Sequence, residues 1–322
     1  MNYKQLTQEE RYQIYALNKA GMTQKEIADV LIRSPSSISR ELKRNRGLKG
    51  YRPKQANELA LHRRRSSFKA SKLTSQVTCW IDKLLHDDLS PEQIAGRLCL
   101  EGRTKLHHET IYQYIYRDKA NGGKLYKKLI RACKKYKKRY GSYDRRGQLV
   151  NRISIDERPK IVDLKSRIGD WEGDTVIGKG RKNAFVTMVE RKTLYTVVQR
   201  IESKHAEITA DALINSMKAY KDMVITVTLD NGKEFAQHER IAKELDADVY
   251  FAHPYSSWER GINENTNGLL RRYFPKGTDF MTLKDKEIQA VVDKLNHRPR
   301  KTRGFKTPHE LFTGQSEILV AA

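Results

Sequence analysis

The stretch TVTLDNGKEF, residues 226–235, is an apolar, strand-like run that ends on a carboxylate, Asp230, and then turns. A tight hairpin would explain the triplet Asp-Asn-Gly, because these residues suit such turns. No second alternating strand follows, however, and the residues from Glu234 onward are typical of a helix. A strand that leads into a helix is where α/β sheets place functional groups, so the sequence predicts a functional carboxylate at Asp230.

Strand-like runs lie on both sides of this stretch. Three of them precede it in quick succession, as in an antiparallel meander, and one follows it. Helical patterns alternate with the later strands, which predicts an α/β domain with a mixed five-stranded sheet and a C-terminal helical extension over residues 161–322. The five runs are GDWEGDTVIG (169–178), NAFVTMVERKT (183–193), LYTVVQRI (194–201), MVITVTL (223–229) and DVYFA (248–252).

Acidic side chains also lie on the first of these strands and on a later helix. Asp170, Glu172 and Asp174 alternate along the strand, so they share one of its faces. Burying a carboxylate without compensation is costly, so these acids either pair with lysines at the surface or serve a function, and the pattern leaves both interpretations open. Glu264 lies on the helix after the last strand, with Arg271 two turns later on the same face.

Carboxylates from two strands and a helix would raise one another's pKa if they met without compensation. Mg²⁺ is a hard cation that prefers oxygen ligands and keeps waters, so one or two carboxylates per ion suffice. Two such ions roughly 3.5–4 Å apart stabilise both the attacking and the leaving oxygen of a phosphoryl displacement. A site of this kind acts on phosphodiesters, such as those of DNA.

The composition also favours a nucleic-acid partner. The 322 residues carry a formal charge of +24, with 63 Lys+Arg against 39 Asp+Glu. Mean hydropathy is −0.75, and no apolar run approaches the ~20 residues that a membrane span requires. The N-terminus lacks the apolar segment of a signal peptide. Three cysteines without CxxC spacing predict reduced thiols in a cytoplasmic protein, with neither a disulfide framework nor a zinc ribbon.

The first fifty residues predict three short helices with the proportions of a helix-turn-helix. Thr7 and Thr23 each have a glutamate three residues later, which fits the capping box that begins a helix. Any small three-helix bundle would show this pattern, but the basic last helix favours DNA binding by residues 1–50. We expect the contacts to come from Ser36, Ser37, Arg40, Lys43 and Arg44. Residues 51–70 are basic and are expected to be a linker.

A second helix-turn-helix-like domain is expected over residues 71–118. The sequence from Ser90 repeats the capping pattern, and another helix follows it. Side chains of that later helix are candidate DNA contacts, although adjacent histidines are often plain surface residues; the candidates are His107, His108, Thr110 and Gln113. Residues 119–160 are expected to be a second basic linker. Its motif KKYKKR (134–139) fits a nuclear localisation patch or a solvated helix face, but the interleaved aromatics favour a contact to the phosphate backbone.

Four motifs together resemble a known family. They are WEGDTVIG (171–178), TLDNGKEF (228–235), FAHPYSSWERGINENTNGLLRRYFPKGTDF (251–280) and LNHRPRKTRGFKTPHELF (295–312). They closely resemble the DDE transposases of the insertion-sequence-thirty family, whose catalytic core belongs to the ribonuclease H-like, retroviral-integrase superfamily. The resemblance covers nearly the whole chain, including the N-terminal helix-turn-helix.

The resemblance implies both a site and a reaction. The metal-binding triad of the family falls on Asp174, Asp230 and Glu264, with Mg²⁺ or Mn²⁺ as two ions per site. The implied reaction cleaves a phosphodiester at the transposon end, and the freed 3′-hydroxyl attacks target DNA. The expected partners are double-stranded DNA, as terminal inverted repeats and target, and further copies of the chain in a bacterial, nucleoid-associated complex. Arg260 becomes a candidate DNA contact, and Arg271 and Lys276 become candidate phosphate contacts.

Two other functions remain compatible with the residues. A DNA-binding regulator with an inert catalytic domain would bind specific DNA without metal-dependent cleavage. A ribonuclease H-type nuclease would hydrolyse RNA–DNA hybrids without strand transfer. The complete acid set favours the transposase, because a protein that only binds DNA has no need of it.

Overall fold

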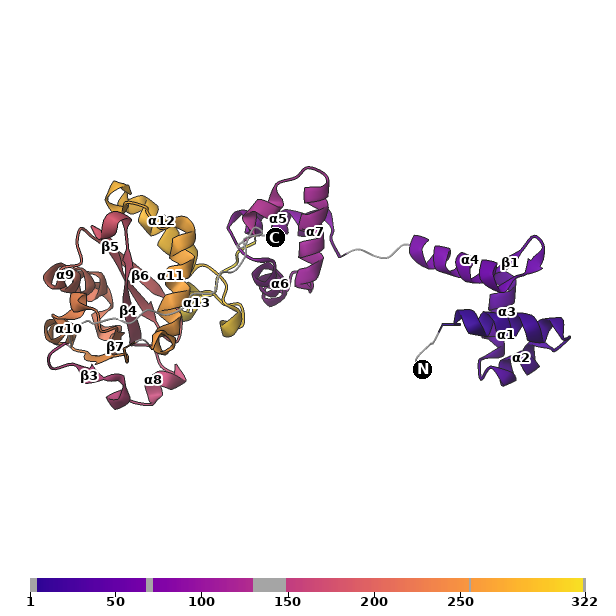
Figure 1. Cartoon of the computed structure of the whole chain (residues 1–322), viewed down its shortest axis with the longest axis horizontal. Helices are drawn as coiled ribbons and strands as arrows, with labels where there is room; N and C mark the ends of the chain where they lie inside the picture. The colour runs from indigo at the N-terminus through magenta and orange to yellow at the C-terminus, as the bar shows by residue number, and fades with distance from the viewer. Residues whose placement is uncertain (1–4, 68–71, 130–148, 255, 321–322) are drawn as a thin grey trace. The chain divides into compact units, whose positions relative to one another are not determined.

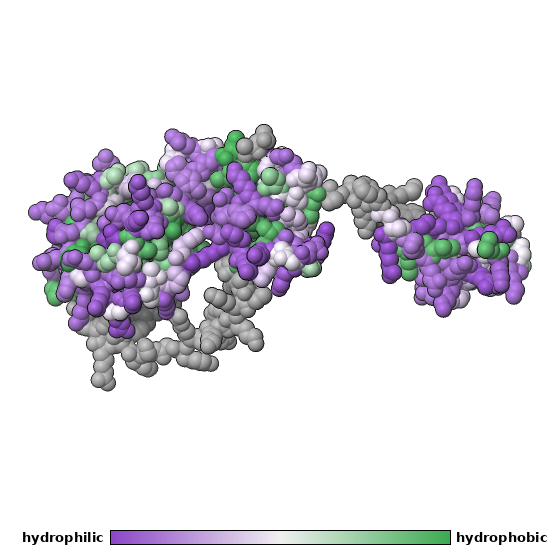
Figure 2. Space-filling model, turned by 90° about the horizontal axis from the view of Figure 1, so that it is seen from above, coloured by the Kyte–Doolittle hydropathy of each residue, from purple (hydrophilic) through white to green (hydrophobic). Residues whose placement is uncertain are grey.

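The computed structural model describes residues 5–67, 72–129, 149–254 and 256–320 (Figure 1). The chain forms two compact units, Met1–Ser71 and Lys72–Ala322. Hydrophilic side chains cover most of the face seen in Figure 2, as the high net charge leads one to expect. The basic motif at 134–139 lies outside the described residues.

Within the described ranges, no helix is both long and apolar enough for a membrane crossing.

The first unit is a helical domain with a small hairpin. Thr7 and Thr23 cap the first two helices with the expected capping boxes, whereas the third begins at a proline without a side-chain cap. The core is formed by six buried residues, Ile14, Ile27, Ala28, Ile38, Tyr51 and Ala56. The elements are α1 (Gln8–Lys19), α2 (Gln24–Val30), α3 (Pro35–Arg44), β1 (Arg46–Gly47), β2 (Gly50–Tyr51) and α4 (Pro53–Ser66).

The segment expected to be a linker, residues 51–70, differs from that expectation. Most of it is the helix α4, which begins with Pro53 at a position where a missing N–H costs nothing. Tyr51 and Ala56 lie in the core of the first unit. The apolar positions of this segment are few, and its run of arginines hides the helical period, which is why the sequence pattern indicated a linker.

The second unit begins with three helices, α5 (Ser75–His86), α6 (Pro91–Leu100) and α7 (His108–Ala120). Ser90 and Gln93 form the predicted capping box of α6. The three helices enclose their own core, which includes Ile81, Leu85, Leu98 and Ile111. A short 3₁₀ turn, η1 (Leu125–Lys128), follows α7.

A six-stranded mixed sheet follows, in the order β3-β8-β7-β4-β5-β6. Strands β4, β5 and β6 form an antiparallel meander. The pairs β4–β7, β7–β8 and β8–β3 are parallel. This is the arrangement of the ribonuclease H-like core, and the predicted fold class is confirmed. The strands are β3 (Ile153–Ser154), β4 (Asp170–Ile177), β5 (Ala184–Glu190), β6 (Thr196–Ile201), β7 (Thr226–Leu229) and β8 (Asp248–Phe251).

The sixth strand, β3, lies inside the expected linker 119–160. It pairs with the edge of β8, so the sheet begins before residue 161. Two residues are too few to show a period of two, so the sequence pattern predicted five strands rather than six. A 3₁₀ turn, η2 (Ile155–Glu157), and the short helix α8 (Ile161–Leu164) connect β3 to β4.

Helices cover both faces of the sheet (Figure 1). One face carries Trp171, Val186 and Met188 and packs against α9 (Ala206–Met217) and α10 (His238–Leu245). The other face carries Val176 and Phe185 and packs against α11 (Gly261–Tyr273) and α12 (Asp285–Asn296). Because side chains alternate along a strand, the acids of β4 lie on the face that α11 covers. The connecting 3₁₀ turns are η3 (Lys179–Arg181), η4 (Lys218–Met223), η5 (Lys233–Phe235), η6 (Ser257–Arg260), η7 (Phe280–Thr282) and η8 (Lys301–Arg303).

The C-terminal segment, with helix α13 (Pro308–Thr313), returns to the α5–α7 helices. Val320 is fully buried in the core of those helices. Arg97 of α6 is buried as well, and its guanidinium binds both carboxylate oxygens of Glu310 at 2.7 and 2.9 Å. The α5–α7 helices and the C-terminal extension are therefore joined by a shared core and a buried ion pair.

Gly96 of α6 lies directly against Phe305 of the C-terminal segment. A Cβ atom at this position would lie 2.3 Å from the ring of Phe305. We expect Gly96→Ala to destabilise the protein by about 1–3 kcal/mol, because the added methyl overpacks the contact. The matched control is Gly268→Ala in α11, where a Cβ meets nothing within 4 Å. It should leave stability equal or raise it by about 0.5–1 kcal/mol. Equal urea midpoints for the two variants would contradict the contact.

Candidate active site

Asp230 lies where β7 ends, as the sequence predicted. Its Oδ1 accepts a hydrogen bond from the backbone N–H of Gly232 at 3.0 Å, which closes a tight turn after the strand. The side chain of the next residue, Asn231, donates to the carbonyl of Ala252 at the end of β8. The turn is thus tied to the neighbouring strand. A Cβ at 232 would lie 2.5 Å from Glu234 Oε2 and 2.9 Å from Asp230 Oδ1, so a larger residue there would displace these carboxylates.

Asp174 lies on the adjacent strand, β4, on the face that α11 covers. Its Oδ1 accepts from the backbone N–H of Thr175 at 2.8 Å, and its Oδ2 accepts from Nδ2 of Asn267 at 2.7 Å. Burial raises the pKa of the Asp174 carboxyl; Arg260 opposes the rise, and the negative charge of Asp230 adds to it. Two carboxylates that influence each other in this way lie in one site.

The other two acids of β4 have structural partners. Asp170 is fully buried and binds Arg167 and the hydroxyl of Thr226. Glu172 accepts from Arg191 at 2.7 Å, and burial raises its pKa despite that charge. The alternation of the strand left all three acids as candidates. In the structure, Asp170 and Glu172 pair with Arg167 and Arg191, whereas Asp174 lies near Asp230 and α11.

Arg260 bridges the two aspartates. Its Nη1 lies 3.6 Å from Asp174 Oδ1, and its Nη2 lies 3.4 Å from Asp230 Oδ2. Nη1 also donates to the carbonyl of Gly173 at 3.1 Å, and the buried Nε has no hydrogen-bond partner among the described residues. The sequence indicated Arg260 as a contact to DNA, and that stays a prediction. The structure places its positive charge between the two carboxylates.

Glu264 lies on α11, one turn before Asn267 and on the same helical face. Since Asn267 binds Asp174, Glu264 is on the side of the helix that covers the aspartates. Its side chain is exposed and makes no hydrogen bond or ion pair within the described residues. The three carboxylates are not brought within the distance of a shared ion; the one group in the described residues that meets this condition lies elsewhere.

The two aspartates are nevertheless suited to divalent ions. Oxygen ligands of this kind are those that Mg²⁺ and Mn²⁺ prefer. Burial and the charge of Asp230 raise the pKa of Asp174, and the guanidinium of Arg260 opposes that rise. Asn267 was not foreseen as part of this site, because only the fold shows that an amide one turn after Glu264 meets the end of a strand.

The remaining basic candidates of this domain lie in different surroundings. Arg271 donates to the carbonyl of Ile177 at 2.5 Å and lies over the ring of Phe280, so much of its side chain is engaged in packing. Lys276 is exposed and makes no hydrogen bond or ion pair within the described residues. Of the two, Lys276 is the one free to meet a phosphate.

Helix α3 presents the predicted basic surface of the first unit. Ser36, Arg40, Lys43 and Arg44 are exposed, and Ser37 is half-buried. A hollow next to Ser37, Arg40 and Arg44 is also lined by Arg63 and Arg64 of α4. Arg63 donates to the carbonyl of Arg44 at 2.7 Å. The run HRRRS at 62–66 was the available signal for these two arginines, but the expected linker concealed that they join α3.

The candidates of the α5–α7 helices lie at the start of α7. His107 is its N-cap, with Nδ1 accepting from the backbone N–H of Glu109, and its ring lies 4.1 Å from that of His108. Gln113 is exposed but bonds to Glu109 at 3.0 Å, and Thr110 is half-buried. The start of α7 is partly accessible, as a DNA-contacting helix requires.

Comparisons with known proteins show which family the chain resembles. The helix-turn-helix domain family matches residues 2–45. The transposase for insertion sequence element IS4351 of Bacteroides fragilis is 43% identical over 96% of this chain and 95% of its own length. The transposase InsI for IS30A of Escherichia coli is 37% identical, covering 95% of this chain and 83% of its own length. The transposase for IS1086 of Cupriavidus metallidurans is 34% identical, covering 96% of this chain and 94% of its own length.

A solved structure, the catalytic core domain of BIV integrase, matches more distantly. It covers 46% of this chain and 95% of its own length, with 20% identity and a TM-score of 0.36. The sequence relatives are far closer, and they extend from the helix-turn-helix through the α/β core to the C-terminal extension. The chain belongs to the IS30 family of insertion-sequence transposases.

Proposed function

We propose that this transposase binds the terminal inverted repeats of its element and catalyses divalent-metal-dependent cleavage and strand transfer through Asp174, Asp230 and Glu264. The observation that carries the proposal is the pair of aspartates on adjacent strands, which a single guanidinium bridges at 3.4 and 3.6 Å. Glu264 would complete the site from the helix that covers this face. When bound, two divalent ions would stabilise the attacking and leaving oxygens of the phosphodiester.

The chain's own residues would prepare this site. Asn267 and the backbone N–H of Thr175 hold Asp174 in one orientation, and the turn at Gly232 holds Asp230. Glu234 binds the hydroxyl of Thr175 at 3.0 Å, which ties the turn after β7 to β4. Ligands fixed in this way lose little freedom when they bind an ion.

Cleavage of DNA tests the proposal directly. The purified protein with Mg²⁺ or Mn²⁺ should nick and join oligonucleotides that carry the ends of its own element, and should not do so in EDTA. Sequence-specific binding with no cleavage under either ion would instead indicate the regulator. Hydrolysis of RNA–DNA hybrids without strand transfer would indicate the nuclease.

Arg260 is expected to compete with the ions for the two aspartates. Partly exposed ion pairs contribute about 0.2–1 kcal/mol each, so Arg260→Gln should raise Mg²⁺ affinity about fivefold. Titration calorimetry without DNA measures this change independently of catalysis. The control is Arg240→Gln, which removes an exposed pair with Asp211 on the opposite face of the sheet and should leave affinity unchanged. Weaker Mg²⁺ binding by Arg260→Gln would contradict competition.

Helix α3 is proposed to contact the DNA backbone. Each neutralised phosphate contributes about 0.9 to the slope of log affinity against log salt. Lys43→Ala should therefore reduce this slope by about one. The matched control is Lys19→Ala, another exposed lysine, at the end of α1. Fluorescence anisotropy over a range of salt concentrations gives both slopes, and equal slopes for the two variants would contradict the role of α3.

Two transposon ends must be held together for strand transfer, so we also propose that the protein acts as a homo-oligomer on DNA, since symmetric assemblies are the usual solution. Light scattering of the complex with paired ends tests this, and a single chain per pair of ends would contradict it.

A further inference from the structure

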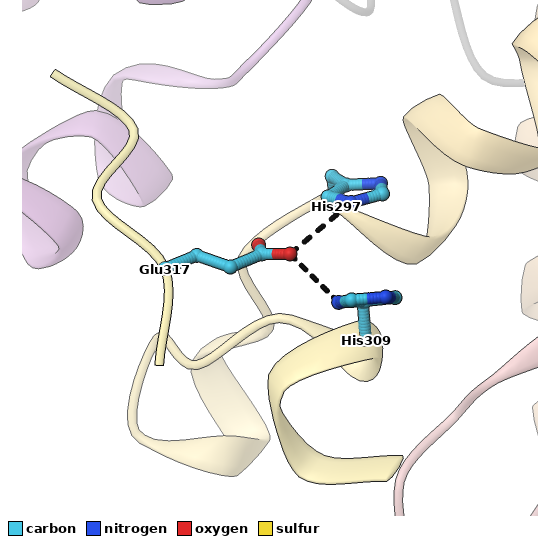
Figure 3. Close-up of side chains that lie close together, drawn as sticks. All are labelled: His297, His309 and Glu317. Carbon is cyan, nitrogen blue, oxygen red and sulfur yellow. Dashed lines mark ion pairs between the residues drawn. The ribbon is translucent and has the colours of Figure 1, made fainter. Parts of the chain in front are cut away.

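Three side chains of the C-terminal extension converge on one carboxylate oxygen (Figure 3). His297 follows the last residue of α12, His309 lies in the first turn of α13, and Glu317 lies beyond that helix. The Nε2 of His297 lies 3.1 Å, and the Nδ1 of His309 lies 2.7 Å, from Oε1 of Glu317. The three ligand atoms lie within 4.8 Å of one another, and no other such trio of His, Cys, Asp or Glu occurs in the described residues.

The hydrogen on His297 can be assigned from its other nitrogen. Nδ1 lies 2.7 Å from the backbone carbonyl of Asp293, which can only accept, so Nδ1 carries the hydrogen. In the neutral ring, Nε2 therefore turns its lone pair toward the carboxylate of Glu317. Two acceptors at 3.1 Å repel each other unless a cation or a second proton lies between them. A bond from the second ring nitrogen to a carbonyl is also how metal-binding histidines are oriented.

One ring nitrogen of His309 lacks a hydrogen-bond partner among the described residues. Its Nδ1 is buried and forms no hydrogen bond with any described residue, although Oε1 of Glu317 is only 2.7 Å away. The distance between Nδ1 and Oε1 is that of a hydrogen bond, but the angles between the two groups are not. The rings of His297 and His309 are stacked, with centroids 4.8 Å apart and an interplanar angle of 21°. Both nitrogens thus approach the carboxylate from the same side (Figure 3).

Glu317 is held in place by contacts that leave Oε1 for the histidines. Its Oε2 accepts from the hydroxyl of Thr307 at 3.2 Å. Its backbone N–H donates to Glu310 at 2.9 Å, and its carbonyl accepts from the buried Arg97. A ligand fixed at both its backbone and its second oxygen is oriented before any ion arrives.

We propose that His297, His309 and Glu317 form a binding site for a divalent transition metal of the zinc class. Two imidazole nitrogens and one carboxylate oxygen suit Zn²⁺, whereas Mg²⁺ prefers oxygen ligands alone. Three protein ligands leave a fourth, tetrahedral position for water. The side chains of His297 and His309 are 43% and 30% exposed, so ions in solution reach the site.

A metal at this site would stabilise the return of the C-terminal segment to the α5–α7 helices. Just beyond Glu317, the backbone N–H of Leu319 donates to Glu101 at 2.9 Å, and Val320 is buried in the α5–α7 core. The metal would connect this segment to the ends of α12 and α13. Its role is therefore structural and separate from the carboxylates of the proposed active site.

Zn²⁺ binding and thermal stability test the site in the full-length chain. Asp230→Asn is used as the background throughout, so that ions at the proposed active site do not obscure the result. Calorimetry should show one Zn²⁺ per chain, and Zn²⁺ should raise the melting temperature in a way that EDTA reverses and Mg²⁺ does not reproduce. Tetrahedral Co²⁺ bound there should absorb visible light.

Glu317→Gln keeps the size of the side chain and removes the charged ligand. It should weaken Zn²⁺ binding at least about tenfold, and His297→Gln, at the exposed end of a helix, should do the same if Glu317→Gln does not fold. The control is His86→Asn, which changes an exposed histidine of α5. This variant should bind Zn²⁺ with the same affinity as the Asp230→Asn background. Equal Zn²⁺ affinity in Glu317→Gln, or a melting temperature that responds to pH but not to Zn²⁺, would overturn the proposal.

Discussion

Asp230→Asn is expected to reduce DNA cleavage and strand transfer by at least about 10³-fold. Metal-ion catalysis supplies several kcal/mol, and each 1.4 kcal/mol corresponds to a factor of ten in rate. The amide keeps the shape of the side chain and its oxygen still accepts from Gly232, so the turn after β7 should survive. Binding to the terminal repeats should be unchanged, because the helix-turn-helix lies in the other unit.

The control for this variant is Asp211→Asn. Asp211 lies on α9, half-exposed, in an ion pair with Arg240, and its substitution should leave cleavage within about twofold, since exposed pairs contribute little. Rates are measured on labelled end oligonucleotides with saturating Mg²⁺. Full strand transfer by Asp230→Asn would show that this carboxylate does not belong to the catalytic site.

Glu310→Gln is expected to lower the free energy of unfolding by about 3–5 kcal/mol, the usual cost of breaking a buried ion pair. Arg97 would keep only Glu101 as a charged partner, at 2.6 Å. Burial alone would raise the pKa of Glu310, but hydrogen bonds from Arg97, Thr307 and Glu317 outweigh it and lower the pKa from 4.5 to about 2. A lowered folded-state pKa stabilises the protein above pH 4.5, and this stabilisation is lost as the pH falls from 4.5 toward 2.

Denaturant unfolding at several pH values measures both effects. Glu310→Gln should be less stable at pH 7 and should show a weaker loss of stability on acidification. The matched control is Glu92→Gln, which removes an exposed ion pair with Lys301 between the same two parts of the fold. This control should lower the free energy of unfolding by no more than about 1 kcal/mol. Equal losses of unfolding free energy in the two variants would show that burial of the Arg97–Glu310 pair does not increase its contribution to stability.

Much of the fold follows from local sequence patterns. The five longer strands and the capped helices were predicted because periods of two and of 3.6, together with capping residues at Thr7, Thr23 and Ser90, extend over enough residues to be seen. The two-residue β3 was not foreseen, because its pairing with β8 depends on residues about a hundred positions away. Helix α4 was not predicted, because its run of arginines obscures the helical period of its few apolar residues.

The candidate site, like the fold, could be predicted from the sequence only in part. Asp230 could be predicted from a strand that ends on an acid, whereas Asp174 needed the resemblance to be chosen over Asp170 and Glu172. In the fold, Asp170 and Glu172 pair with Arg167 and Arg191, and the assignment of Asp174 stays a prediction. The position of Arg260 could not be predicted, because it depends on how η6 and α11 cross the sheet. The same holds for the cluster of His297, His309 and Glu317, which lie at the end of α12, in α13 and in the segment after α13.

The most direct test of the central claim is anomalous scattering from Mn²⁺ in crystals of the protein bound to its terminal repeats. The proposal predicts two Mn²⁺ peaks, bound by the carboxylates of Asp174, Asp230 and Glu264, with the Arg260 side chain displaced from the aspartates. Absence of Mn²⁺ at these residues, with Arg260 still between Asp174 and Asp230 beside bound DNA, would contradict it.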